Sequence, residues 1–320
     1  MPNLLLTSAG RRGVLIRIFQ RELKAVFADA KVFAADLRPE LSSACQLADG
    51  SFQVPRVTAE DYIPRLIELC KANGITLIIP TIDPELQVLA ESRERLAEHG
   101  ITPLISDFQL VQICRDKRLT HDFFVEHGLD VPGIVDPTTI GRFPLFAKPY
   151  DGSSSLNTYV IWSADDLTPT LLANPKLIYL DYLSPTEYDE YTVDMYYDRT
   201  GELKCLVPRL RLETRAGEVS KGRTAWLPSF KSLREGMGRI ETARGCLTVQ
   251  VFVKRSTGEV FGIEINPRFG GGYPLSYDAG ANFPKWVIEE YLLGRAIDWF
   301  DDWELNLTML RYDDHVLVRG

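Results

Sequence analysis

The chain has 320 residues, of which 45% are hydrophobic and 25% are charged, a composition that excludes disordered, collagen-like and coiled-coil proteins. At about 150 residues per domain, this length predicts roughly two domains. The 36 Lys and Arg residues are outnumbered by 44 Asp and Glu residues, giving a net charge of −8. An acidic chain is a poor electrostatic partner for nucleic acid or an anionic membrane, although a local basic cleft can still bind phosphates.

The sequence carries no pattern of export, membrane insertion or zinc binding. No apolar run approaches the roughly 20 residues of a membrane span. The first apolar run ends at Leu6 with no cationic segment before it, so we expect no signal peptide. The five cysteines are widely spaced without a Cys-x-x-Cys pair, which favours a reduced, cytoplasmic protein. The four histidines lack zinc-binding spacing.

The first third of the chain alternates between short apolar runs and segments of helical periodicity. We expect strands at 4–7, 32–35, 77–79 and 101–105, and helices at 15–26, 60–73 and 84–98. This alternation predicts a parallel sheet with helices on both faces. Such sheets bind ligands at the carboxyl ends of their strands, which here lead into the loops 8–13, 36–38 and 80–85.

The rest of the chain follows a different pattern. A helix is expected at 107–127, short strands at 144–148 and 157–161, and long β-rich segments after about residue 176. Two hairpins are predicted, one joining 188–197 to 203–212 and the other joining 249–253 to 260–265. We therefore expect an α/β fold followed by an antiparallel α+β fold, divided into residues 1–111, 112–175 and 176–320.

The most informative side chains lie on the second hairpin and just after it. Because side chains alternate along a strand, Glu264 and Asn266 share a face, and Gln250 on the partner strand can point to the same side. One carboxylate and two amide oxygens suit a magnesium ion that is also held by substrate phosphates. Arg268 would then bind a phosphoryl or carboxylate group. The alternative is an exposed hairpin ending in an Asn-Pro turn.

The glycines that follow, Gly270–Gly272, permit close approach of the backbone to a ligand, or else form an ordinary flexible loop.

A second set of residues is typical of phosphate binding. Lys148 ends a predicted strand and is followed by a small-residue loop that contains Gly152, Ser153, Ser154 and Ser155. Backbone N–H groups of such a loop can hold phosphate oxygens, although a solvated turn is the alternative. Lys117 lies on a charged helical face, which is usually only solvated. Neither a P-loop motif nor Gly-x-Gly-x-x-Gly occurs, while the loop 8–13 opens a helix and can bind an anion.

Charged residues also accompany the first hairpin. Asp181, Tyr182 and Leu183 would link two domains and contact a flat base, and Glu190 would accept hydrogen bonds from ribose hydroxyls. The alternative for each is a surface acid beside a strand. A basic stretch then forms either a cationic roof over phosphates or the solvated side of a sheet; it consists of Arg209, Arg211, Arg215, Lys221 and Arg223.

No Ser or Cys has the context of a catalytic nucleophile, which favours a mechanism of charge neutralisation and positioning.

In this order the motifs resemble the ATP-grasp superfamily, especially single-copy relatives of the carbamoyl-phosphate synthase large subunit and carboxylate–amine ligases. The Gln250-to-Glu264 spacing and the string Glu-Ile-Asn-Pro-Arg are the specific parts. The resemblance implies a Rossmann-like pre-ATP-grasp domain followed by a two-lobed ATP-grasp domain. It assigns ATP binding to Lys117, Lys148, Gly152, Ser153, Ser154, Ser155, Asp181, Tyr182, Leu183 and Glu190, metal binding to Gln250, Glu264 and Asn266, and catalysis to Arg268, Arg211 and Lys221. The single glycine in the loop and Asp181 in place of Glu depart from the family pattern.

The resemblance implies an enzyme that uses ATP with Mg²⁺ or Mn²⁺ to convert a small carboxylate into an acyl phosphate, which an amine or similar nucleophile then attacks. Its partners would be small acids and amines, and a homo-oligomer is compatible with the sequence. A chain of 320 residues holds one ATP-grasp unit, so a complete carbamoyl-phosphate synthase is not expected. The alternatives are a component that phosphorylates bicarbonate or carbamate, a non-catalytic ATP-binding module, and an oxidoreductase built on the front sheet.

Overall fold

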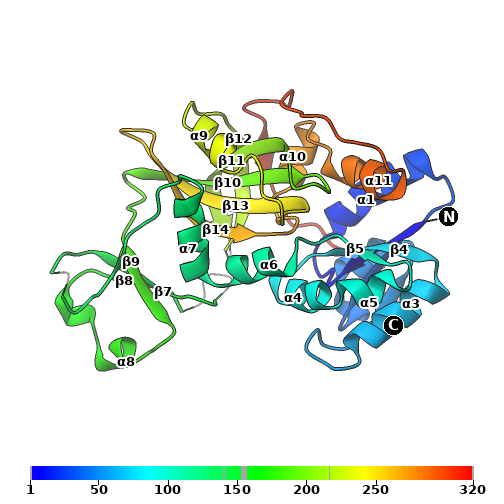
Figure 1. Ribbon diagram of the computed structural model, residues 1–320, viewed down its shortest axis with the longest axis horizontal. Coiled ribbons are helices and arrows are strands. Elements are labelled where there is room, and N and C mark those ends of the chain that lie inside the picture. The colour runs from blue at the N-terminus through cyan, green and yellow to red at the C-terminus, as the bar shows by residue number, and fades with distance from the viewer. Residues whose placement is uncertain (1, 140, 153–156, 216, 319–320) are drawn as a thin grey trace.

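The computed structural model describes residues 2–139, 141–152, 157–215 and 217–318, whose strands form three sheets (Figure 1). A parallel sheet and a small antiparallel sheet lie at opposite ends of the molecule, with a large antiparallel sheet between them. None of the helices within the described ranges is long and apolar enough to cross a membrane.

The parallel sheet, sheet A, has the strand order β3-β2-β1-β4-β5. Its strands are β1 (Asn3–Thr7), β2 (Val32–Asp36), β3 (Ser51–Gln53), β4 (Ile75–Pro80) and β5 (Thr102–Pro103). The helices that accompany it are α1 (Gly13–Val26), α2 (Ser43–Leu47), α3 (Tyr62–Ala72), α4 (Asp83–Glu91) and α5 (Arg93–Ala97), with a 3-10 turn, η1 (Pro39–Leu41). The predicted parallel α/β arrangement is confirmed.

Three local predictions in this part need correction. The helix expected at 84–98 is two helices separated at Ser92, whose ψ of 9° departs from helical geometry. The strand expected at 101–105 is only two residues long, because Pro103 has no N–H to donate to a ladder. The edge strand β3 was not expected, since only its central residue, Phe52, is apolar.

The helix expected at 107–127 is also two helices, α6 (Phe108–Arg115) and α7 (Lys117–Glu126). Asp116 separates them in an extended conformation, with φ −104° and ψ 114°, and its side chain accepts a hydrogen bond from the backbone N–H of Arg118. This capping interaction satisfies a free N–H group at the start of α7. It places Lys117 in the first turn of that helix.

The small antiparallel sheet, sheet C, has the order β6-β9-β7-β8. Its strands are β6 (Ile134–Val135), β7 (Leu145–Pro149), β8 (Tyr159–Ile161) and β9 (Leu177–Asp181), with η2 (Ala164–Asp166) and α8 (Pro169–Leu172) between the last two. Because β9 pairs with β6 and β7, a boundary drawn by sheets falls after Asp181 rather than at residue 176.

The large antiparallel sheet, sheet B, has the order β14-β13-β10-β11-β12-β15. Its strands are β10 (Tyr188–Tyr197), β11 (Leu203–Arg215), β12 (Glu218–Thr224), β13 (Gly245–Lys254), β14 (Val260–Asn266) and β15 (Thr308–Leu310), and its helices are α9 (Phe230–Gly236), α10 (Pro274–Asp278) and α11 (Phe283–Leu292). Both predicted hairpins are confirmed, β10 with β11 and β13 with β14.

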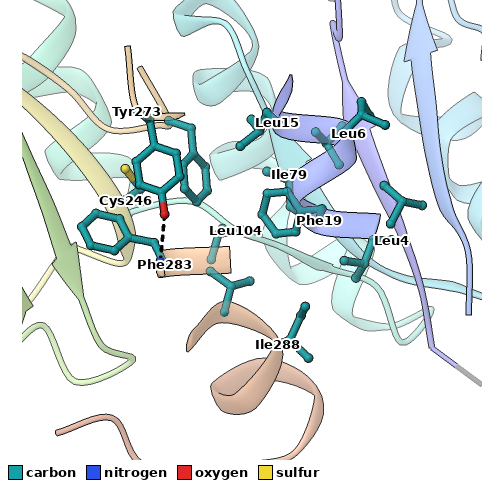
Figure 2. Close-up of a cluster of buried hydrophobic side chains, with 14 of the residues drawn as sticks. Leu4, Leu6, Leu15, Phe19, Ile79, Leu104, Cys246, Tyr273, Phe283 and Ile288 are labelled. Carbon is teal, nitrogen blue, oxygen red and sulfur yellow. Dashed lines mark hydrogen bonds between the residues drawn. The ribbon is translucent and has the colours of Figure 1, made fainter. Parts of the chain in front are cut away.

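Sheet B separates two hydrophobic cores. On one face, Val193, Met195 and Val249 pack in a cluster with Phe124 of α7 and Phe230 of α9. On the other face, the buried side chains belong to a cluster that also contains residues of β1, α1 and α11 (Figure 2). The second cluster therefore fixes sheet A against sheet B, and the burial of each large apolar side chain contributes roughly 1.5–3 kcal/mol to folding.

The same face of sheet B also holds a buried ion pair. Arg209 and Asp194 are 1% and 0% exposed, and Nε of the arginine lies 2.7 Å from Oδ2 of the carboxylate. Ser276 Oγ donates to the same carboxylate over 2.6 Å. Arg209 is therefore part of the core, and neither interpretation of the basic stretch, a solvated face or a roof over phosphates, holds for it.

We expect Arg209→Met to destabilise the protein by about 3–5 kcal/mol, because it leaves the Asp194 carboxylate buried without its partner. Urea unfolding followed by tryptophan fluorescence measures the change. Arg215→Met is the control, since Arg215 lies on the same strand as Arg209 but forms an exposed pair with Asp313, and surface pairs contribute less than about 1 kcal/mol. Equal small effects of the two substitutions would contradict the core role.

Candidate active site

The hairpin of β13 and β14 supplies the centre of the candidate site. Gln250 lies directly opposite Glu264, and Asn266 lies opposite Thr248, so the three predicted metal ligands share one face of sheet B as expected from strand alternation. The intervening Val249 and Ile265 point into the core on the other face. Nδ2 of Asn266 donates to Oε1 of Glu264 over 3.0 Å, which orients the carboxylate.

Glu190 on β10 extends this polar group toward β11. Its Oε1 accepts a hydrogen bond from Nε2 of Gln250 and lies 3.4 Å from Nε of Arg211. Burial raises the pKa of Glu190, an effect that Arg211 and Gln250 oppose and Glu264 strengthens. Arg211 therefore belongs to the site.

Two lysines from outside sheet B lie near the carboxylate of Glu264. Lys148 on β7 is 6% exposed, and its ammonium has no hydrogen-bond or ion-pair partner in the part of the chain that the structure describes. Its pKa is lowered to about 8 because burial disfavours the charge, an effect that Glu264 opposes and Lys117 strengthens. The pKa of Lys117 is also lowered by burial, against the attraction of Glu264. A buried ammonium without a counter-ion is costly and favours an anionic ligand.

The segment after Lys148 is described only in part. The carbonyl of Gly152 accepts a hydrogen bond from Nζ of Lys117, which ties the start of the loop to α7. Ser153, Ser154 and Ser155, predicted to hold phosphate, lie outside the described residues.

The predicted linker joins sheet C to sheet B. Asp181 ends β9, and Tyr182 and Leu183 lead toward β10. Nη2 of Arg142 donates to Oδ1 of Asp181 over 2.6 Å, while the ring of Tyr182 meets Trp162 edge-on at 5.7 Å. These residues lie in the connection between the two sheets, as expected of a linker.

Arg268 lies just beyond β14 and contacts a residue that the sequence did not single out. Its Nη2 donates to Oδ2 of Asp83 over 2.6 Å and to Oδ1 of Asn266 over 3.4 Å. Asp83 begins α4 after strand β4 of sheet A, and its Oδ1 is buried without a hydrogen-bond partner among the described residues. The loop 80–85 was expected to face a ligand, but nothing in the local pattern marked Asp83 as the partner of Arg268.

Lys221, predicted to act with Arg268, is not brought to this group. It pairs across the ladder with Glu213, and its Nζ lies 2.7 Å from Oε2 of that glutamate on an exposed surface. Its neighbour Gly222 lies opposite Arg211, so alternation directs Lys221 to the other face of the sheet. A β-bulge between Arg211 and Glu213 explains why the sequence did not predict that Arg211 and Lys221 point to opposite faces of the sheet.

A cavity of about 260 Å³ adjoins the site between sheets A and B. Its walls are the loop after β1, the start of α1, the glycine loop after Arg268, and parts of β12, α10 and β15. We call it the arginine cavity because three arginines, Arg11, Arg12 and Arg311, line it together with a single carboxylate, that of Glu218.

The donors around Glu264 fit a magnesium ion that is only partly held by protein. No group of three or more His, Cys, Asp or Glu side chains suited to a metal occurs in the described ranges. One carboxylate and two amide oxygens would leave positions for water and phosphate oxygens, which is how Mg²⁺ is commonly bound at phosphate sites.

Two family models match parts of the chain. Residues 4–104 match the N-terminal domain of PylC-like proteins, and residues 173–309 match a model described as ATP-grasp in the biosynthetic pathway with Ter operon. No curated protein matches the chain.

Solved structures resemble this chain over most of its length. Pyruvate carboxylase from Rhizobium etli is 19% identical with a TM-score of 0.71, over 96% of this chain but only 30% of that one. Biotin carboxylase from Campylobacter jejuni is 16% identical with a TM-score of 0.73, over 96% and 74%. The L-amino acid ligase from Bacillus licheniformis is 16% identical with a TM-score of 0.66, over 91% and 74%. At these identities the likeness establishes the fold.

We expect Glu264→Gln to lower the pKa of Lys148 further, because the substitution removes the negative charge that raises it. The pKa can be measured from lysine side-chain NMR signals in protein labelled with ¹³C-lysine, with Lys148→Arg used for assignment. An unchanged pKa would show that the two side chains do not interact. Glu259→Gln is the control, because Glu259 lies at the opposite end of the same hairpin.

Proposed function

The chain belongs to the ATP-grasp superfamily, and from this premise we propose that it is an ATP-dependent ligase for a small carboxylate and an amine or similar nucleophile. The observation that carries the proposal is the ammonium of Lys148, which is buried near Glu264 and has no hydrogen-bond or ion-pair partner among the described residues. In the proposal, these cations, the carboxylate of Glu264 and the amides of Gln250 and Asn266 together form the ATP site.

In this proposal the nucleotide lies between sheets B and C. Lys148 and Lys117 neutralise its phosphates. Glu190 accepts hydrogen bonds from the ribose, and residues 181–183 contact the base. The connection of sheet C to sheet B through these residues supports this arrangement.

Gln250, Glu264 and Asn266 would hold Mg²⁺, or Mn²⁺ in its place. When bound, the ion would neutralise charge on the terminal phosphates of ATP. The hydrogen bond from Asn266 to Glu264 keeps the amide and carboxylate together at one end of β14.

The reaction needs charge stabilisation rather than a protein nucleophile. A carboxylate oxygen of the substrate attacks the γ-phosphorus of ATP, the bond to ADP breaks, and an acyl phosphate forms. The amine then attacks the acyl carbon, phosphate leaves with the bonding electron pair, and the amine loses a proton. Arg268 would stabilise the charge on the reacting groups, with Arg211 at the side of Glu190; the position of Lys221 does not support the same role.

We further propose a pre-ATP-grasp domain, residues 1–111, and two ATP-grasp lobes, predicted as 112–175 and 176–320. The boundary between the lobes moves to after Asp181, because β9 pairs within sheet C. A cytoplasmic location and small acid and amine substrates belong to the same proposal.

ADP release tests the function directly. Purified protein with Mg²⁺ and ATP should release ADP faster when a panel of carboxylic acids is added with amines. Stimulation by bicarbonate alone would favour the carbamoyl-phosphate-synthase-like alternative. Tight ATP binding without turnover in any mixture would contradict a ligase and favour a non-catalytic module.

Glu264→Gln should reduce turnover by about 10²–10³-fold or more, on the scale of a lost electrostatic contact to the transition state. It should also weaken binding of the Mg²⁺–nucleotide complex, as measured by calorimetry. Glu259→Gln leaves both quantities unchanged if the effect is specific to the site. Full activity of Glu264→Gln would refute the metal assignment.

Nucleotide affinity should fall as the pH rises through about 8, the value to which the pKa of Lys148 is lowered. Phosphates bind the charged ammonium and raise its pKa in the complex, so binding above pH 8 requires uptake of a proton. Affinity then falls by up to about tenfold per pH unit. Calorimetric dissociation constants for ADP should show this slope in the parent protein and not in Lys148→Met, which should bind ADP more weakly. The same slope in both proteins would exclude Lys148 as its origin.

A further inference from the structure

The arginine cavity is positive within an acidic chain. Arg11, Arg12 and Arg311 face one carboxylate, Glu218, so the charge of the lining is 3 − 1 = +2, whereas the whole chain has a net charge of −8. The excess of positive charge is therefore confined to the cavity, and a local positive potential attracts anions.

Glu218 cannot neutralise all three arginines. Its Oε2 lies 3.2 Å from Nη1 of Arg311, and its Oε1 lies 4.0 Å from Nη2 of Arg11. Burial would raise the pKa of Glu218, but Arg12, Arg311 and Arg11 together lower it. The carboxylate is therefore ionised and already shared.

Arg12 is the least neutralised of the three. Its guanidinium makes no hydrogen bond or ion pair within the described ranges. Its pKa is lowered to about 10, chiefly by burial and also by repulsion from Arg268 and Arg311, while Glu218 and Asp83 oppose the shift. Its Nη1 lies so near Gly271 that a Cβ there would be 2.6 Å away, so this glycine makes room for the guanidinium.

The start of α1 adds to the positive potential. Arg12 is the N-cap residue of this 14-residue helix, its side chain makes no capping hydrogen bond, and the first turn contains no acidic residue. Gly10, Val14 and Leu15 from the same segment line the cavity. Free N–H groups at a helix start attract an anion. The guanidinium of Arg12, which has no partner within the described ranges, adds to this attraction.

The cavity is adjacent to the reacting end of the proposed active site. Gly270 and Gly271, which line it, follow Arg268 in the chain after Phe269. Arg268 and Arg12 repel each other strongly enough to affect the pKa of Arg12. A single small molecule can therefore reach both arginines, and Pro274 and Met309 provide an apolar wall for its carbon skeleton.

We propose that the acid activated by this protein carries a second anionic group, a phosphate ester or a second carboxylate, which Arg12 and Arg311 bind in the arginine cavity. The proposal rests on the ligase function above, since one end of the acid reacts beside Arg268. It narrows the substrate class to dianionic acids.

The first test compares acids that differ only in the second anion. Succinate is paired with butyrate, and 3-phosphoglycerate with glycerate, in the ADP-release assay with a mixture of amines. The dianionic member of a pair should stimulate release at least about tenfold more, the scale of one charge-assisted contact. The pair that responds distinguishes a carboxylate from a phosphate ester. Equal stimulation by the monoanionic members would overturn the proposal and leave the ligase function standing.

The second test measures binding without turnover. Inorganic phosphate is titrated calorimetrically into protein saturated with Mg²⁺ and ADP. Arg12→Met and Arg311→Met should each weaken phosphate binding about tenfold or more, whereas Lys148→Met should retain a cavity-bound phosphate. Arg17→Met, on an exposed position of the same helix, is the matched control. Loss of phosphate binding only in Lys148→Met would place the anion in the nucleotide site and overturn the proposal.

The third test is a substitution, Glu218→Gln, that should increase phosphate affinity. A misfolded protein would not show such an increase. Removal of the shared carboxylate frees Arg311 and Arg12, so phosphate should bind several-fold more tightly than to the parent protein. Unchanged or weaker binding would contradict the proposal. These titrations do not depend on catalysis. If Glu218→Gln shows this gain while the parent protein releases no ADP with any acid and amine, the anion site is supported and the ligase function is refuted.

Discussion

The contact between Phe19 and Phe269 links the first domain to the segment that follows the β13–β14 hairpin. The two rings meet edge-on with centroids 5.6 Å apart, and both are buried in the cluster shared by α1, α11 and sheet B (Figure 2). Phe269 follows Arg268 directly, so the ring fixes the backbone that carries the arginine. This anchoring explains how Asp83, at the start of α4, comes within 2.6 Å of the guanidinium of Arg268, just beyond β14.

The candidate site brings together cationic side chains that carboxylates of the described residues neutralise only in part. Lys148 is buried and has no partner among the described residues, and Arg12 is repelled by Arg268 and Arg311. Each such charge costs stability when no anion is bound. Two hydrophobic cores, one on each face of sheet B, offset that cost and hold the cations in place. A binding site that is destabilised without its ligand can bind anions tightly, because the ligand neutralises charges already positioned for it.

The sequence predicted those features that depend on local alternation. The shared face of Gln250, Glu264 and Asn266 followed from strand periodicity and hairpin pairing. Features that depend on long-range packing were missed. Arg209 entered the core because Asp194 pairs with it there, while Ser276 donates to the same carboxylate. Neither residue is near Arg209 in the sequence. Lys221 was misplaced because a bulge changes the alternation. Asp83 went unrecognised because its partner lies 185 positions away.

The glycine run at 270–272 connects these separate features. A Cβ at Gly270 would lie 3.0 Å from Oγ1 of Thr248, one at Gly271 would meet Nη1 of Arg12 at 2.6 Å, and one at Gly272 would overlap Nη1 of Arg209. None of the three has a positive φ, so space rather than backbone conformation explains the need for glycine. The sequence suggested that this run lets a ligand approach the backbone or is a flexible loop. Instead, side chains of the protein itself approach it, two of them arginines. The run therefore brings the buried ion pair and the arginine cavity together on either side of one loop, two residues beyond Arg268.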